Sequence, residues 1–154
     1  MSVKINTKVK KFKVSATNEL EIDSSDLIGK SYVIYFYPKD NTPGCTQEGE
    51  DFRDLYKEFK KLKTEIYGVS RDSLKSHEGF KEKYKYPFEL ISDTEEKLCN
   101  LFDVIKEKNM YGKKYMGIER STFLINKEGK LSAEWRKVKA VSYTHLRAHE
   151  TIAN

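Results

Sequence analysis

The order of apolar and polar residues along the chain predicts strands that alternate with helices. Residues 32–37 form an unbroken β-branched and aromatic run, and a strand without polar alternation is typical of the buried centre of a parallel sheet. A long helix is expected to follow, because its apolar residues recur at helical spacing and form one stripe: Phe52, Leu55, Tyr56, Phe59 and Leu62.

Shorter patterns complete the expected fold. Strands are predicted at residues 11–14, 19–22, 64–70, 88–91, 120–126 and 131–135, and further helices at 73–85 and 95–102. Residues 106–116 are expected to form a glycine- and lysine-rich loop. Strands that alternate with helices indicate an α/β domain, and the antiparallel pair that closes it makes the central sheet mixed.

Composition excludes several classes of protein. The chain has 154 residues, of which 12% are aromatic, so we expect one domain with a substantial core. No apolar run has the length of a membrane span, and the N-terminus lacks the apolar segment of a secretory signal, so we expect a cytoplasmic protein that does not bind membranes. The two cysteines, Cys45 and Cys99, are too few for a disulfide framework or a cysteine-based zinc site, and no metal or cofactor is expected.

The basic charge does not point to nucleic acid. The formal net charge is +5, but lysines alternate with acids and outnumber arginines 24 to 5. Bidentate recognition of phosphates and bases favours arginine, so we interpret the lysines as a solvated surface. A basic nucleic-acid binder is the alternative, and it has no motif to support it.

The last residues differ in character from the rest of the chain. Residues 141–154 contain no lysine but two of the three histidines, His145 and His149. Residues 141–151 resemble the translation of an adapter used in sequencing libraries, and we interpret 141–154 as a foreign or disordered tail. Residues 1–140 would then be the domain, and we expect a helix that normally covers its sheet to be missing at the C-terminal end.

Cys45 stands where a nucleophile would be activated. Thr42 is a plausible N-cap and Pro43 suits the first helical position, which places Cys45 in the first turn of the long helix. Free backbone N–H groups and the helix dipole favour a thiolate there. The alternative is a small buried residue that happens to open a helix.

The neighbours of Cys45 limit its chemistry. Thioredoxin-like exchange needs a second cysteine at position 48, which is Glu48, and a cysteine protease needs a histidine base. Outside residues 141–154 the only histidine is His77, which we expect to be a solvated surface residue because it lies on a polar helix. A thiolate activated by electrostatics alone must attack a weak bond, and the O–O bond of a peroxide fits.

The segment FYPKDNTPGCTQE resembles the active-site segment of the peroxiredoxins, Pro-x-x-x-Thr-x-x-Cys. LISDTEEKLC and GIERSTFLINKEGK resemble the bacterioferritin comigratory protein (PrxQ) subfamily, and the resemblance runs from about residue 11 to residue 139. It implies a thioredoxin-like fold, a thiol-dependent peroxidase activity towards hydrogen peroxide and organic hydroperoxides, and thioredoxin or another small thiol as reductant.

The resemblance also implies roles for particular residues. Cys45 would be the peroxidatic cysteine, and the hydroxyl of Thr42 would hydrogen-bond the peroxide. Pro38 would shield the thiolate, and Arg120 would place its guanidinium beside the sulfur, where a permanent charge and a planar fork suit two oxygens in transit. Glu48 would help to position Arg120, although acids are common at helix starts.

The subfamily's resolving cysteine has no counterpart at its usual places. Many members carry it five residues after the peroxidatic cysteine or on the following helix, where this chain has Glu50 and Lys81. Cys99 is the remaining candidate, but its apolar surroundings predict a buried cysteine. We therefore expect a one-cysteine mechanism in a monomer, with an external thiol attacking the sulfenic acid. The alternative is a non-catalytic, truncated thioredoxin-fold protein.

Overall fold

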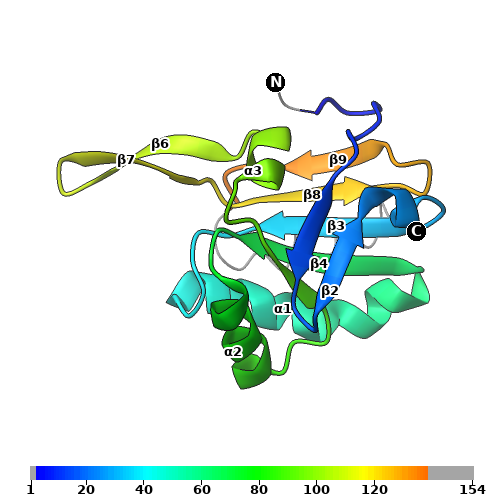
Figure 1. Ribbon diagram of the computed structural model, residues 1–154, viewed down its shortest axis with the longest axis horizontal. Coiled ribbons are helices and arrows are strands. Elements are labelled where there is room, and N and C mark those ends of the chain that lie inside the picture. The colour runs from blue at the N-terminus through cyan, green and yellow to red at the C-terminus, as the bar shows by residue number, and fades with distance from the viewer. Residues whose placement is uncertain (1–2, 139–154) are drawn as a thin grey trace.

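The computed structural model describes residues 3–138. Its centre is a seven-stranded mixed sheet in the order β2-β1-β5-β4-β3-β8-β9, with α1 and α2 on one side and the short α3 on the other (Figure 1). A separate two-stranded sheet, β6 and β7, projects from this body as a hairpin (Figure 1). The expected α/β fold with a central mixed sheet is confirmed.

The elements follow the predicted order with small shifts at their ends. The strands of the main sheet are β1 (Lys13–Ala16), β2 (Leu20–Asp23), β3 (Ser31–Phe36), β4 (Thr64–Ser70), β5 (Glu89–Ser92), β8 (Ser121–Ile125) and β9 (Leu131–Trp135). The helices are α1 (Pro43–Lys61), α2 (Leu74–Tyr84) and α3 (Lys97–Leu101), with a 3₁₀ turn, η1, at Ser24–Leu27.

The uninterrupted apolar run of β3 places side chains in both layers of the core. Val33 and Tyr35 pack under α1 and α2, whereas Ile34 and Phe36 pack under α3. All four are at most 1% exposed, because the two core layers cover the faces of β3 while β4 and β8 pair with its two edges. A central strand with both faces covered needs no polar alternation, as the sequence predicted.

One prediction about the main chain is wrong. Residues 106–116 do not form a loop but lie in two paired strands, β6 (Ile105–Met110) and β7 (Lys113–Ile118). Tyr111 and Gly112 make the two-residue turn between them, with φ angles of 52° and 79°. Two successive residues with positive φ produce the turn that matches the twist of a hairpin. The lysines that suggested a loop lie along the exposed strands.

Within residues 3–138, no helix is both long enough and apolar enough to span a membrane. The predicted tail at 141–154 and the expected loss of a helix at the C-terminal end fall outside the described residues. Both therefore stay predictions.

Candidate active site

The loop between β3 and α1 brings Cys45 to the end of the sheet. β3 ends at Phe36, and α1 begins at Pro43, so Cys45 lies in the first helical turn as predicted. Its thiol is buried, with 1% of the residue exposed. The free N–H groups of this turn and the helix dipole favour a negative charge on the sulfur.

Thr42 is the residue before α1, in the extended conformation of an N-cap. Its hydroxyl does not cap the helix, however, because it donates a hydrogen bond to the Lys39 carbonyl oxygen at 2.8 Å. The predicted position is therefore confirmed and the predicted capping bond is wrong. The bond to Lys39 fixes the hydroxyl within the loop that leads to Cys45.

Arg120 lies far from Cys45 in the sequence but contacts it in the fold. It follows β7 and precedes β8, and β8 pairs with β3, so the sheet brings residues that are 75 positions apart together. Its Nη2 donates to Cys45 Sγ at 3.3 Å, and its Nη1 donates to Glu48 Oε1 at 2.7 Å. One planar guanidinium thus holds both groups, which a lysine ammonium with its single charged centre does not do.

Glu48 is the buried partner of this guanidinium. Its residue is 2% exposed, and its Oε2 has no hydrogen-bond partner among the described residues. Burial raises the pKa of Glu48 to about 7, although Arg120 pulls it downward. Burial lowers the pKa of Arg120, but the negative groups Glu48 and Cys45 outweigh this effect and raise it overall.

The hairpin contributes a second cation near the sulfur. Burial, followed by repulsion from Arg120, lowers the pKa of Lys108 on β6, while attraction to Cys45 opposes this shift. The hairpin thus interacts electrostatically with the site through Lys108. The sequence prediction named no hairpin residue as part of the site, because it placed this segment in a loop.

Cys99 lies in a different part of the core. It is fully buried on α3, as predicted, and packs in the layer under that helix, whereas Cys45 packs in the layer under α1. Burial raises the pKa of the Cys99 thiol, and the neighbouring Asp93 raises it further. Both conditions keep the thiol protonated and a poor nucleophile.

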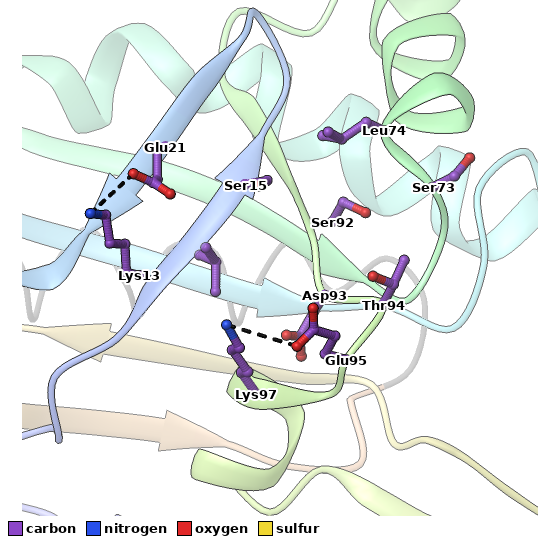
Figure 2. Close-up of a pocket in the computed structure, with 11 residues that line it drawn as sticks. Lys13, Ser15, Glu21, Ser73, Leu74, Ser92, Asp93, Thr94, Glu95 and Lys97 are labelled. Atoms are coloured by element: carbon purple, nitrogen blue, oxygen red, sulfur yellow. Dashed lines mark ion pairs between the residues drawn. The ribbon is translucent and has the colours of Figure 1, made fainter.

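A polar cavity of about 310 Å³ lies between the β1–β2 hairpin and the starts of α2 and α3 (Figure 2). Asp93 lines it and accepts hydrogen bonds from the backbone N–H groups of Leu98, at 3.1 Å, and Cys99, at 2.8 Å. No residue of the predicted site lines this cavity. Within this cavity, Asp93 thus serves the start of α3.

The prediction for His77 is wrong. This residue is fully buried, and its ring nitrogens contact Asp40 Oδ2 at 2.7 Å and the Ile91 carbonyl oxygen at 2.9 Å. Its spacing carried a signal, because His77 lies three residues before Phe80 and seven before Tyr84 on one face of α2. The polar neighbours in the sequence concealed that face.

A buried thiol at a helix start, held by an arginine that also binds a buried carboxylate, defines a class of protein that uses cysteine as a redox nucleophile. Comparison with known proteins agrees: the family model described as "AhpC/TSA family" matches residues 5–134, and the chain belongs to this family. Its curated relatives include peroxiredoxin Bcp of Xanthomonas campestris, 56% identical over 126 residues, which are 79% of each chain.

A second relative and the solved structures agree. Peroxiredoxin Bcp of Bacillus subtilis is 52% identical over 139 residues, which cover 90% of this chain and 88% of the relative. A structure of Xanthomonas campestris peroxiredoxin Q superposes with a TM-score of 0.86 at 50% identity, covering 92% of this chain and 89% of that one. The resemblance to Bcp/PrxQ peroxiredoxins and the thioredoxin-like fold are confirmed, and the chain is a thiol peroxidase, an oxidoreductase.

Proposed function

We propose that Cys45 reduces hydrogen peroxide and organic hydroperoxides as a single working cysteine. The observation that carries this proposal is the hydrogen bond from Arg120 to Cys45 Sγ, which places a permanent positive charge beside the buried sulfur. One structural relative, the bacterioferritin comigratory protein of Xanthomonas campestris, is described by its alkyl peroxide reduction activity.

The first step consumes the peroxide. The Cys45 thiolate attacks the nearer oxygen of the O–O bond, an S–O bond forms, and the farther oxygen leaves as hydroxide or alkoxide, which takes a proton to give water or alcohol. Arg120 stabilises the charge as it moves from sulfur to oxygen. Thr42 would hydrogen-bond the peroxide, Pro38 would shield the sulfur from water, and Glu48 would orient the guanidinium.

The second step restores the thiol. One external thiolate attacks the sulfenic sulfur, an S–S bond forms, and hydroxide leaves and takes a proton to give water. A second thiolate then attacks the reductant's sulfur in this mixed disulfide, which releases the Cys45 thiolate and leaves the reductant as a disulfide. The placement of the two cysteines in layers on opposite faces of the sheet supports this external route. Thioredoxin or another small thiol as the reductant, a monomeric state and a cytoplasmic location stay predictions.

The proposal can be tested by treating the protein with one equivalent of hydrogen peroxide in the presence of a cyclic diketone that traps sulfenic acids. The products are then identified by intact mass spectrometry. The wild type and Cys99→Ser should both gain the trap on Cys45, and Cys45→Ser should gain none and consume no peroxide. A loss of two hydrogen atoms that requires both cysteines would overturn the one-cysteine route. Peroxide consumption that survives in Cys45→Ser would overturn the whole proposal.

A further inference from the structure

A closed polar cluster lies beneath the loop that precedes Cys45, and the peroxidase chemistry does not use it. Its centre is Asp40, which is 4% exposed. The carboxylate accepts hydrogen bonds from the Tyr37 hydroxyl at 2.7 Å and the Ser76 hydroxyl at 2.7 Å, and it contacts His77 Nδ1 at 2.7 Å. Buried polar groups that are fully bonded fix one arrangement of the chain around them.

The ring of His77 has no free nitrogen. Its Nε2 faces the Ile91 carbonyl oxygen, which only accepts, so this nitrogen carries a hydrogen. Its Nδ1 faces Asp40, and one proton is shared across that contact. The same side chains, with Asp72, have their polar atoms within 4.8 Å of one another. We call this cluster of Tyr37, Asp40, Asp72, Ser76 and His77 the latch, because its contacts tie the loop before Cys45 to α2.

The latch holds the loop that leads to Cys45. Asp40 lies between Pro38 and Thr42, the two loop residues that the proposed mechanism places around the sulfur. The backbone N–H of Asp40 also donates to Asp72 Oδ2 at 2.9 Å, so both its main chain and its side chain are tied to the segment that carries α2. The next residue, Asn41, has a φ angle of 62°, which the anchored loop has to maintain.

The same loop must move during a catalytic cycle. Cys45 is 1% exposed, so an external thiol can attack the sulfenic sulfur only when the loop or the first turn of α1 opens. A closed loop favours the reaction with peroxide because it keeps Thr42 in place at the start of α1, next to Cys45. An open loop favours the reaction with thiol.

We infer that His77 is a positioning residue: through Asp40 it holds the 38–42 loop closed on Cys45 and so sets the balance between oxidation by peroxide and reduction by thiol. This inference rests on the proposed one-cysteine function. It assigns His77 no contact with substrate. Loosening the latch should therefore slow the oxidation of Cys45 by peroxide and speed up its reduction by thiol. A general loss of stability would not change the two rates in opposite directions.

Two replacements of His77 separate the contacts of its ring. His77→Asn keeps an N–H near the position of Nδ1 and should retain the bond to Asp40, whereas His77→Gln keeps one near Nε2 and should lose it. Ser76→Ala removes a single bond to Asp40 from a partly exposed residue and is a milder test. Glu82→Gln, an exposed position on the same helix, is the control.

Stopped-flow mixing with hydrogen peroxide gives the oxidation rate of Cys45, and addition of dithiothreitol to the oxidised protein gives the rate of reduction. In His77→Gln oxidation should slow by about tenfold, as expected for losing a hydrogen bond to a charged group, while reduction accelerates. Ser76→Ala should shift both rates in the same directions by less, and His77→Asn and Glu82→Gln should resemble the wild type.

Three results would overturn the inference. In His77→Gln, both half-reactions could slow while the melting temperature falls. Alternatively, neither rate could change in His77→Gln and Ser76→Ala, or His77→Asn could behave like His77→Gln. A wild-type protein whose Cys45 is not oxidised at all would instead overturn the proposed function. The two failures are thereby distinguished.

Discussion

Replacing Arg120 by glutamine tests the centre of the proposed chemistry. The change removes the donor that lies 3.3 Å from Cys45 Sγ and the partner that lies 2.7 Å from Glu48 Oε1. At an effective dielectric constant of about 20, a unit charge pair at this sulfur distance interacts by roughly 5 kcal/mol, much of which is offset by desolvation. Loss of one preorganised donor to developing charge typically costs about 3–4 kcal/mol, or roughly 10²–10³ in rate.

The same substitution also threatens the fold, and the two effects can be separated. Removing one partner of a buried ion pair destabilises a protein by about 3–5 kcal/mol because the other charge is left without compensation. Here the remaining charge belongs to Glu48, whose pKa is about 7 with Arg120 present and rises further without it, so the carboxyl tends to become neutral. The double variant Arg120→Gln/Glu48→Gln should therefore regain most of the lost stability and none of the lost rate.

Stopped-flow measurement of the second-order rate constant with hydrogen peroxide is the assay, with thermal melting of each variant in parallel. Arg120→Lys should fall between the wild type and Arg120→Gln, because it keeps a charge but loses the fork that binds two groups. A folded Arg120→Gln protein that reacts within about tenfold of the wild-type rate would refute the reasoning, since oxidation would then proceed without the guanidinium.

Two further outcomes are expected. Because burial raises the pKa of Glu48 from 4.5 to about 7, the native chain binds more protons than the unfolded chain between these pH values, so stability should fall as pH rises through that window. Glu48→Gln should remove this slope in urea unfolding, and an unchanged slope would contradict the assignment. A Cβ at Gly68 would lie 2.8 Å from atoms of Leu90 and Tyr35, so Gly68→Ala should destabilise by roughly 1–3 kcal/mol. Gly79→Ala, with open space around the new carbon, is the matched control and should stabilise α2 by roughly 1 kcal/mol in thermal melting.

The sequence was informative where a local pattern determines the outcome. The apolar run of β3 and the stripe of α1 report burial directly, because neighbouring positions of one element share an environment. The position of Cys45 in the first helical turn also followed from adjacent residues, since Thr42 and Pro43 mark where a helix begins. The role of Cys45 as a nucleophile was inferred from the same pattern, whereas that of Arg120 came from resemblance to a known family; both roles stay proposals.

What the sequence did not reveal depends on contacts between distant segments. His77 stands between Ser76 and Glu78, and its buried ring contacts Asp40, which lies 37 positions earlier. The hairpin was missed for a different reason. Tyr111 adopts a positive φ, which is uncommon for an aromatic residue, so the turn had no conventional signature such as Asn-Gly.

The projecting hairpin has a consequence for how copies of this chain meet one another. β6 and β7 pair only with each other within the described residues, so each strand has an outer edge with backbone groups to which a second chain could add. Lysines occupy both strands, at Lys106 and Lys108 on one and Lys113 and Lys114 on the other. Their mutual repulsion opposes the edge-to-edge growth that leads to aggregation. The hairpin also exposes apolar side chains, Met110, Met116 and Tyr111 at its tip, which is 99% exposed, so the charges along its edges are what opposes the addition of a second chain.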